Sequence, residues 1–175
     1  MPPTPPTPAT TPDGIADLRR MSAAELERLG RDSLRDHVLA QAAVARHKHG
    51  PLDAGRLDAL LQDPECLRHP TRLVFEFGPM ALHQLGEPDV DWRDPEGRGR
   101  VIHLRPALRD NPDGRVLATV YLIPVVNYGS TVTDALCLAY GAILLGLEEE
   151  EYYRRLCLLA DSLGVESRSE AAGEG

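Results

Sequence analysis

The sequence predicts a single α+β domain, in which a small, mainly antiparallel sheet packs against helices. Two observations lead to this class: segments with helical periodicity occupy both ends of the chain, and segments with strand-like patterns lie between them. The predicted domain spans residues 14–165. A Pro- and Thr-rich tail at 1–13 and an acidic tail at 166–175 hold too few apolar residues to join a core, so we expect both to be disordered.

The amino-terminal part predicts two helices. Ser22 followed by Glu25 is a capping-box pattern, which predicts a helix from this point to Gly50, with Gly30 as a candidate break. A second, shorter helix is predicted in residues 53–63. The first helix carries an apolar stripe that is expected to pack on the core, formed by Leu34, Val38, Ala42 and Ala45.

The first predicted strand covers residues 71–77 and alternates in polarity. Its core-facing side chains are expected to be Leu73, Phe75 and Phe77. A short helical turn beginning at Pro79 should follow, since proline suits a first helical position. We expect residues 86–100 to form a long irregular loop.

Residues 100–108 and 115–126 predict a β-hairpin. Asn-Pro-Asp-Gly lies between them and is typical of a type I turn. Because the second segment is apolar on both faces, other structure should cover both sides of the sheet. The expected cross-strand pairs are His103 with Ile123 and Arg105 with Tyr121.

The carboxyl-terminal part predicts a helical hairpin. Residues 131–145 are apolar nearly all round, which predicts the most buried helix of the domain. Gly146 should end it, and a second helix should begin with four glutamates and use Arg154 and Arg155 as ion-pair partners one turn later. Close approach to the first helix is permitted by its small residues, Ala135, Ala139, Gly141 and Ala142.

Gly129, Ser130 and Thr131 are the candidate ligand-binding residues. Glycine and two hydroxyl residues before a helix expose backbone N–H groups at the positive end of its dipole, which suits phosphate or carboxylate. The alternative is that Ser130 or Thr131 is only the helix N-cap, and we expect this plain cap. The segment lacks the glycines and lysine of a P-loop.

A divalent metal is the candidate cofactor. Glu76, His83 and His103 would supply one carboxylate and two imidazoles if they converge on the sheet face, a set suited to zinc or non-haem iron, or to a base and its orienting partner. The alternative is a hydrogen-bonded pair between strands, because the spacing matches no metal signature. His47 and His49 are assigned to the last turn of a helix, where they complement its dipole, and not to a metal.

Trp92 lies among acidic residues in the long predicted loop and is the candidate contact with another protein. The alternative is a solvated acidic loop that this one aromatic side chain anchors. A net charge of −8 without clustered Lys and Arg argues against nucleic acid as a partner. The longest apolar run is interrupted by Asp134, so no membrane span is expected. Three cysteines without a C-x-x-C spacing indicate buried thiols in a reducing cytoplasm.

No compact set of catalytic residues is visible in the sequence. We therefore expect a soluble, non-catalytic interaction or adaptor domain. The alternative is a small enzyme or a ligand- or metal-binding protein that uses the sheet face and the segment at Ser130. A cavity lined by Glu76, His83, His103 and Tyr121 would favour this alternative, whereas an exposed apolar patch would favour protein binding.

Overall fold

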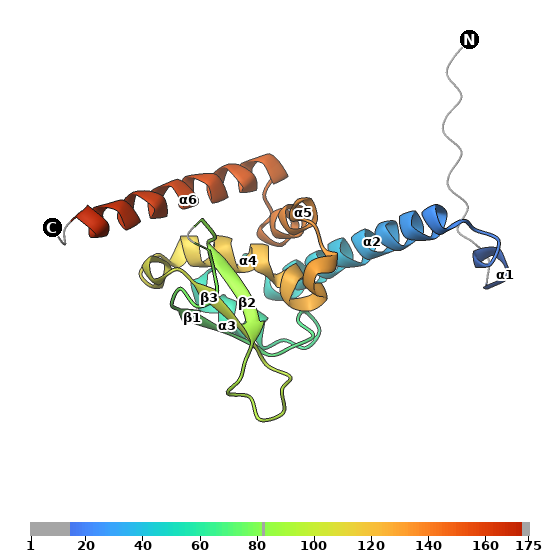
Figure 1. The fold of residues 1–175 in the computed structure, drawn as a ribbon, viewed down its shortest axis with the longest axis horizontal. Coiled ribbons are helices and arrows are strands. Elements are labelled where there is room, and N and C mark those ends of the chain that lie inside the picture. The colour runs from blue at the N-terminus through green and yellow to red at the C-terminus, as the bar shows by residue number, and fades with distance from the viewer. Residues whose placement is uncertain (1–14, 82, 173–175) are drawn as a thin grey trace, which may run out of the picture. The chain divides into compact units, whose positions relative to one another are not determined.

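The computed structural model describes residues 15–81 and 83–172, and the side chains of 17–81 and 83–164. The chain divides into two compact units, Met1–Asp36 and His37–Gly175, and each is described by itself (Figure 1). The boundary falls inside one long helix. The predicted tail at 1–13 lies outside the described residues, and the extent of the predicted single domain, 14–165, remains a prediction.

The first unit contains the short helix α1 (Ile15–Leu18) and the beginning of α2 (Ala23–His49). The predicted capping box is confirmed: the Ser22 hydroxyl accepts a hydrogen bond from the Glu25 backbone N–H at 3.3 Å, and the Glu25 carboxylate accepts one from the Ser22 N–H at 2.8 Å. α2 continues through Gly30 without a break, so the candidate interruption there is wrong.

The second unit begins with the remainder of α2, where Val38, Ala42 and Ala45 of the predicted stripe are buried. The fourth residue of that stripe, Leu34, belongs to the first unit and is half-buried. The predicted second helix is α3 (Ala54–Leu61), capped by the Asp53 carboxylate. It buries Leu57, Leu60 and Leu61.

A three-stranded mixed sheet follows, in the order β1-β3-β2. β1 (Thr71–Phe75) pairs in parallel with β3 (Arg100–Leu104), and β2 (Gly86–Val90) pairs antiparallel with β3. The α+β class is confirmed. Two details of the prediction are wrong: β1 stops at Phe75 and leaves Phe77 47% exposed, and residues 86–90 are a strand and not part of a loop.

Residues 76–85 link β1 to β2. In the described part of this link, hydrogen bonds from Met80 N to Phe77 O and from Gln84 N to Ala81 O form turns and no helix. The helical turn predicted at Pro79 is therefore wrong. β2 was not predicted as a strand, because its sequence Gly-Glu-Pro-Asp-Val lacks alternating apolar residues and contains residues that are rare in strands.

The predicted hairpin is wrong as well, because its second arm is the helix α4 (Pro112–Tyr128). The Asn111 side chain caps this helix by accepting from Gly114 N at 2.8 Å, and Pro112 occupies the first turn. Asn-Pro-Asp-Gly serves equally well as a turn and as a helix start, which explains the error. The residues beside His103 in the sheet are Val74 and Glu87, and Arg105 lies beyond the end of β3.

α4 is the central element of this unit and contacts β2, β3, α3, α5 and α6 (Figure 1). Burial on all sides explains why its sequence is apolar on every face. The expectation that residues 131–145 form the most buried helix is therefore wrong. α4 buries more of its residues than the following helix does, and these include Thr119 and Asn127.

The carboxyl-terminal helical hairpin is confirmed as α5 (Asp134–Leu145) and α6 (Glu149–Ala172). Gly146 ends α5 in the left-handed conformation with φ 70°. Arg154 and Arg155 both pair with Glu151, at 2.8 and 2.7 Å. The backbone of α6 continues past Val165 to Ala172, beyond the predicted limit of the domain. Among the helices of the described residues, none has the length and apolar character needed to cross a membrane.

Candidate functional site

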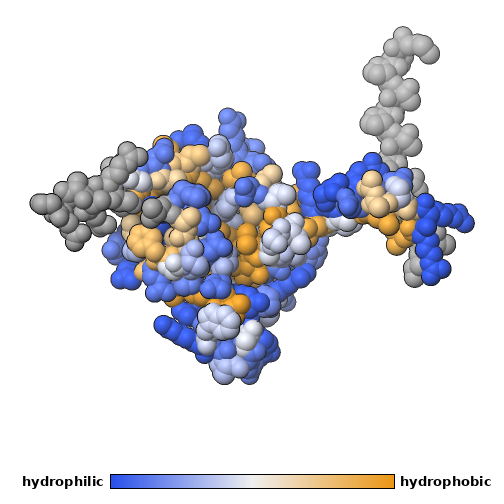
Figure 2. All heavy atoms as spheres, in the orientation of Figure 1, coloured by the Kyte–Doolittle hydropathy of each residue, from blue (hydrophilic) through white to orange (hydrophobic). Residues whose placement is uncertain are grey.

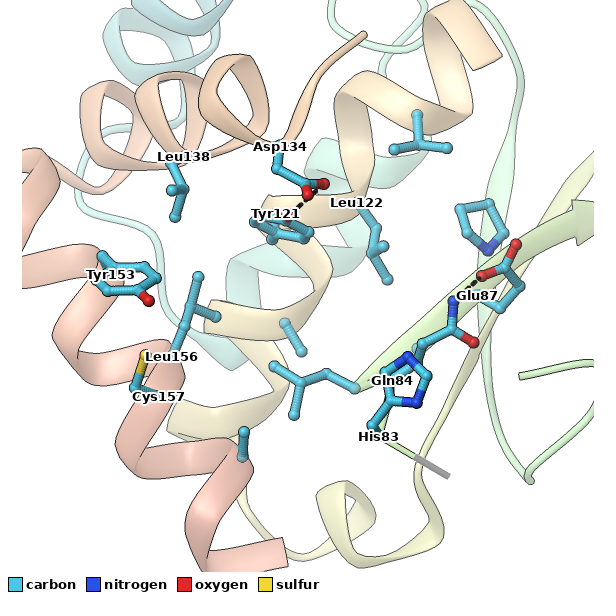
Figure 3. Close-up of a pocket in the computed structure, with 16 residues that line it drawn as sticks. His83, Gln84, Glu87, Tyr121, Leu122, Asp134, Leu138, Tyr153, Leu156 and Cys157 are labelled. Atoms are coloured by element: carbon cyan, nitrogen blue, oxygen red, sulfur yellow. Dashed lines mark hydrogen bonds between the residues drawn. The ribbon is translucent and has the colours of Figure 1, made fainter. Parts of the chain in front are cut away.

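A cavity of about 560 Å³ opens between β2, α4, α5 and α6, all within the second unit (Figure 3). Its wall is mainly apolar and includes Leu85, Leu122, Val125, Leu138, Leu156 and Ala160. In Figure 2, apolar residues are visible among hydrophilic ones on the face that carries β2 and α6. A volume of this size suits a small molecule or several side chains of a partner.

The two long walls of the cavity are helix faces with the same spacing. α4 contributes Ala118, Tyr121, Leu122 and Val125, and α6 contributes Tyr153, Leu156, Cys157 and Ala160. In both cases the residues follow one another at intervals of three, one and three, which places them on one side of a helix. The cavity is therefore bounded by two stripes of side chains, one from each helix.

Two pairs of polar side chains lie at the cavity. The Tyr121 hydroxyl donates to Asp134 Oδ1 at 2.9 Å, and the Gln84 amide donates to Glu87 Oε2 at 2.9 Å (Figure 3). Burial, followed by the hydrogen bond to Asp134, raises the pKa of Tyr121 well above its ordinary value, so the phenol keeps its proton. Of the described residues that line the cavity, none is Lys or Arg. Two carboxylates therefore give the cavity an acidic character.

The predicted set of Glu76, His83 and His103 is divided between two places. Glu76 Oε1 lies 3.3 Å from Nδ1 of the largely buried His103, while His83 is exposed at the edge of the cavity. Tyr121 also lines the cavity, but Glu76 and His103 do not. The alternative offered by the sequence, a hydrogen-bonded pair between strands, is therefore wrong, because Glu76 lies one residue beyond β1 and His103 Nδ1 makes no hydrogen bond among the described residues. The metal role of Glu76, His83 and His103 remains a prediction.

The helix start predicted at Ser130 does not exist. Gly129 ends α4 with φ 61°, and Gly129–Thr131 forms a short 3-10 turn in which the Thr131 hydroxyl donates to Tyr128 O at 2.7 Å. The N-cap of α5 is Thr133, whose hydroxyl accepts from Leu136 N at 3.3 Å. The cap prediction is therefore wrong by two to three residues. The ligand role of Gly129, Ser130 and Thr131 remains a prediction, without the helix end on which it rested.

Trp92 is 85% exposed in the loop between β2 and β3. The neighbouring acidic residues hold this loop in shape. Asp91 pairs with Arg72 through two hydrogen bonds of 2.5 and 2.9 Å, and Asp94 accepts from the backbone N–H groups of Glu96, Arg98 and Gly99. Trp92 is thus presented to solvent on a fixed loop, as a contact residue would be, and its partner role remains a prediction.

A second group of side chains was not predicted from the sequence. His49 Nε2 lies 2.8 Å from Asp63 Oδ2, and Cys66 Sγ donates to the same oxygen at 3.6 Å. Burial raises the pKa of Cys66 to about 11, so its thiol is not a nucleophile near neutral pH. The available signal was Asp-x-x-Cys directly after a helix, but the sequence does not reveal that His49 folds back onto it.

Comparison of the chain with protein-family models, with curated proteins and with solved structures finds no match.

Proposed function

We propose that the chain is a non-catalytic interaction domain that receives an amphipathic, basic helix of a partner protein in the cavity between β2, α4, α5 and α6. The observation that carries this proposal is the mainly apolar wall of the cavity combined with Glu87 and Asp134, with no Lys or Arg among the lining residues that the structure describes. An apolar face of the partner would cover the leucines and valine, and a Lys or Arg would pair with a carboxylate. The three free cysteines suit a cytoplasmic setting.

Strand addition is a less suitable binding mode, although β2 lies at the sheet edge. Hydrogen bonds from Arg105 N to Leu85 O and from Asp91 N to Gly99 O fix the alternation of the β2–β3 pair, so Gly86, Pro88 and Val90 direct their backbone groups outward. Pro88 has no N–H, and the Val90 N–H is already bonded to Asp89 Oδ1 at 2.7 Å. Two of the three outward positions of this edge therefore lack the donor that an added strand would use.

A helix fits the geometry better. The stripes of α4 and α6 have the spacing by which helices pack side by side, and Leu85 and Leu138 add further apolar side chains to the wall. A catalytic use of the same cavity receives less support, because Tyr121 and Gln84 already donate to Asp134 and Glu87. Small-molecule binding is the second candidate function, supported by the cavity volume and by the presence of His83 and Tyr121.

A selection from displayed helical peptides tests the proposal. The library should contain matched amphipathic helices whose polar flanks are either basic or acidic, offered to the full chain. We expect enrichment of basic members with apolar residues at i, i+3, i+4 and i+7. Selected peptides should bind at least about tenfold more weakly to the double variant Glu87→Gln/Asp134→Asn, since truncating paired charges costs more than 1.4 kcal/mol.

Trp92→Ala provides the matched control, because it alters the other candidate contact surface. Its peptide affinity should equal that of the unmodified chain. Loss of binding in Trp92→Ala with retention in the double variant would overturn the cavity and assign the interaction to the loop. Absence of any enrichment of basic over acidic helices would contradict the proposed partner chemistry and leave small-molecule binding as the better account.

A further inference from the structure

His49, Asp63 and Cys66 bring a nitrogen, an oxygen and a sulfur ligand atom together within 4.8 Å. His49 is the last residue of α2, Asp63 lies just after α3, and Cys66 follows in the next turn. The three ligand side chains are mostly buried: those of His49 and Asp63 are 12% and 7% exposed, and Cys66 is 3% exposed. All three belong to the second unit, away from the residues that line the cavity.

The backbone that carries these ligand atoms is firmly held. Asp63 O accepts from Cys66 N at 3.0 Å and from Leu67 N at 2.8 Å, which closes a tight turn. The buried Asn127 of α4 donates to Cys66 O at 3.0 Å and accepts from Arg68 N at 2.9 Å. The turn is thus fixed to the central helix, which reduces the entropy lost when a ligand binds.

We propose that His49, Asp63 and Cys66 form a zinc site with three protein ligands and a fourth position open to water. Thiolate, imidazole and carboxylate are the ligands that zinc uses in proteins, at about 2.0 to 2.3 Å from the metal. A tetrahedral ion with such bonds separates its ligand atoms by roughly 3.3 to 3.8 Å. The His49–Asp63 contact of 2.8 Å must therefore open by about 1 Å or less, which side-chain rotation supplies.

Binding exchanges protons and charges in a balanced way. The zinc ion forms a bond to the Cys66 sulfur as the thiol releases its proton to solvent, and His49 binds as the neutral imidazole. With Asp63 ionised, the two negative ligands neutralise the charge of the ion. No oxidant or reductant takes part.

Lys48 is the natural competitor of the metal. Its ammonium lies 2.8 Å from Asp63 Oδ2 and 2.7 Å from Glu65 Oε2, so it neutralises the carboxylate that zinc would bind. The side chains of Lys48 and Glu65 are 43% and 69% exposed, which allows the ammonium to move outward while it keeps Glu65 as its partner. Lys48 therefore marks the side from which an ion enters, and its removal should strengthen binding.

Cobalt(II) titration of the metal-stripped, reduced full chain tests the site, because cobalt replaces zinc and reports a bound thiolate through a charge-transfer band in the near ultraviolet. We expect saturation at one equivalent and competition by zinc. The band should disappear in Cys66→Ser and remain in Cys137→Ser, which alters a buried cysteine outside the cluster. Affinity should fall at least about tenfold in His49→Gln and rise in Lys48→Gln.

A second measurement does not depend on the spectrum. Zinc should raise the melting temperature saturably in the original chain and in Cys137→Ser, and not in His49→Gln or Cys66→Ser, because a ligand specific to the folded state stabilises it by mass action. No charge-transfer band, or a band that survives in Cys66→Ser, would overturn the proposal. So would a Lys48→Gln chain that loses stability without gaining affinity, since that result describes a plain hydrogen-bond cluster. None of these outcomes depends on peptide binding in the cavity.

Discussion

Gly141 of α5 lies against the ring of Tyr152 of α6 so closely that an added Cβ would overlap the ring carbon Cε1. Tyr152 is fully buried, and its hydroxyl donates to Leu117 O of α4 at 2.8 Å. Gly141 thus leaves room for the Tyr152 ring, so that the Tyr152 hydroxyl can donate a hydrogen bond to Leu117 O of α4. The close approach predicted for the small residues of this segment occurs at Gly141.

Gly141→Ala should destabilise the chain by about 1 to 3 kcal/mol, because the new methyl group must displace a buried ring that has a fixed hydrogen bond. The matched control is Gly164→Ala in α6, where an added Cβ meets nothing within 4 Å. This second variant should be neutral or gain up to about 1 kcal/mol from helix propensity. Urea denaturation measures the free energy of unfolding of both variants. Equal values for Gly141→Ala and Gly164→Ala would contradict the packing of α5 on α6.

The start of α5 gives a second prediction. Thr133→Ala removes the side chain that accepts from Leu136 N and should cost about 0.5 to 2 kcal/mol in denaturant titrations. Ser130→Ala serves as the control, because Ser130 is exposed in the turn before the helix and should change stability by less than about 0.5 kcal/mol. A loss in Ser130→Ala with none in Thr133→Ala would restore the helix start predicted from the sequence.

The Arg72–Asp91 pair gives a prediction about pH. The guanidinium of Arg72 lowers the pKa of Asp91 from 3.8 to about 2. A lowered folded-state pKa means that the pair stabilises the fold above about pH 4 and that this contribution is lost as pH falls toward 2. In Arg72→Met the Asp91 pKa should return toward its ordinary value, and the difference in stability between the two proteins should shrink over this interval.

Carboxyl carbon NMR shifts followed from pH 6 to 2 measure this directly for Asp91. Glu151, whose pKa is lowered to about 2 by hydrogen bonds from Arg154 and Arg155, is the internal control whose midpoint should be the same in both proteins. An unchanged Asp91 midpoint in Arg72→Met would show that Arg72 does not hold the carboxylate in solution.

Local signals in the sequence predicted the start of α2 and the end of α5 correctly. The capping box of Ser22 and Glu25 marks the start of α2, and Gly146 marks the end of α5. They failed where one signal fits two structures. Asn111-Pro112 begins either a turn or a helix, and an apolar segment of this length suits a buried strand as well as a buried helix.

The candidate sites depend on contacts that local patterns do not encode. The cavity forms because two stripes of side chains, which begin at Ala118 and Tyr153 and lie 35 residues apart, are on helices that pack together. Nothing in the sequence of one stripe indicates that it packs near the other. His49 was explained by its place at a helix end, and only the fold shows Asp63 and Cys66 beside it. Trp92 is 85% exposed, and its contact with another protein remains a prediction.

Pro88 in β2 also affects how the chain behaves at high concentration. Open sheet edges are the places where identical chains join into aggregates, and proline is one of the residues that prevent such growth. Here the proline interrupts the row of outward donors, and Asp89 occupies the N–H of Val90. The residues that made β2 hard to recognise as a strand are thus the ones that make its edge a poor template for fibril growth.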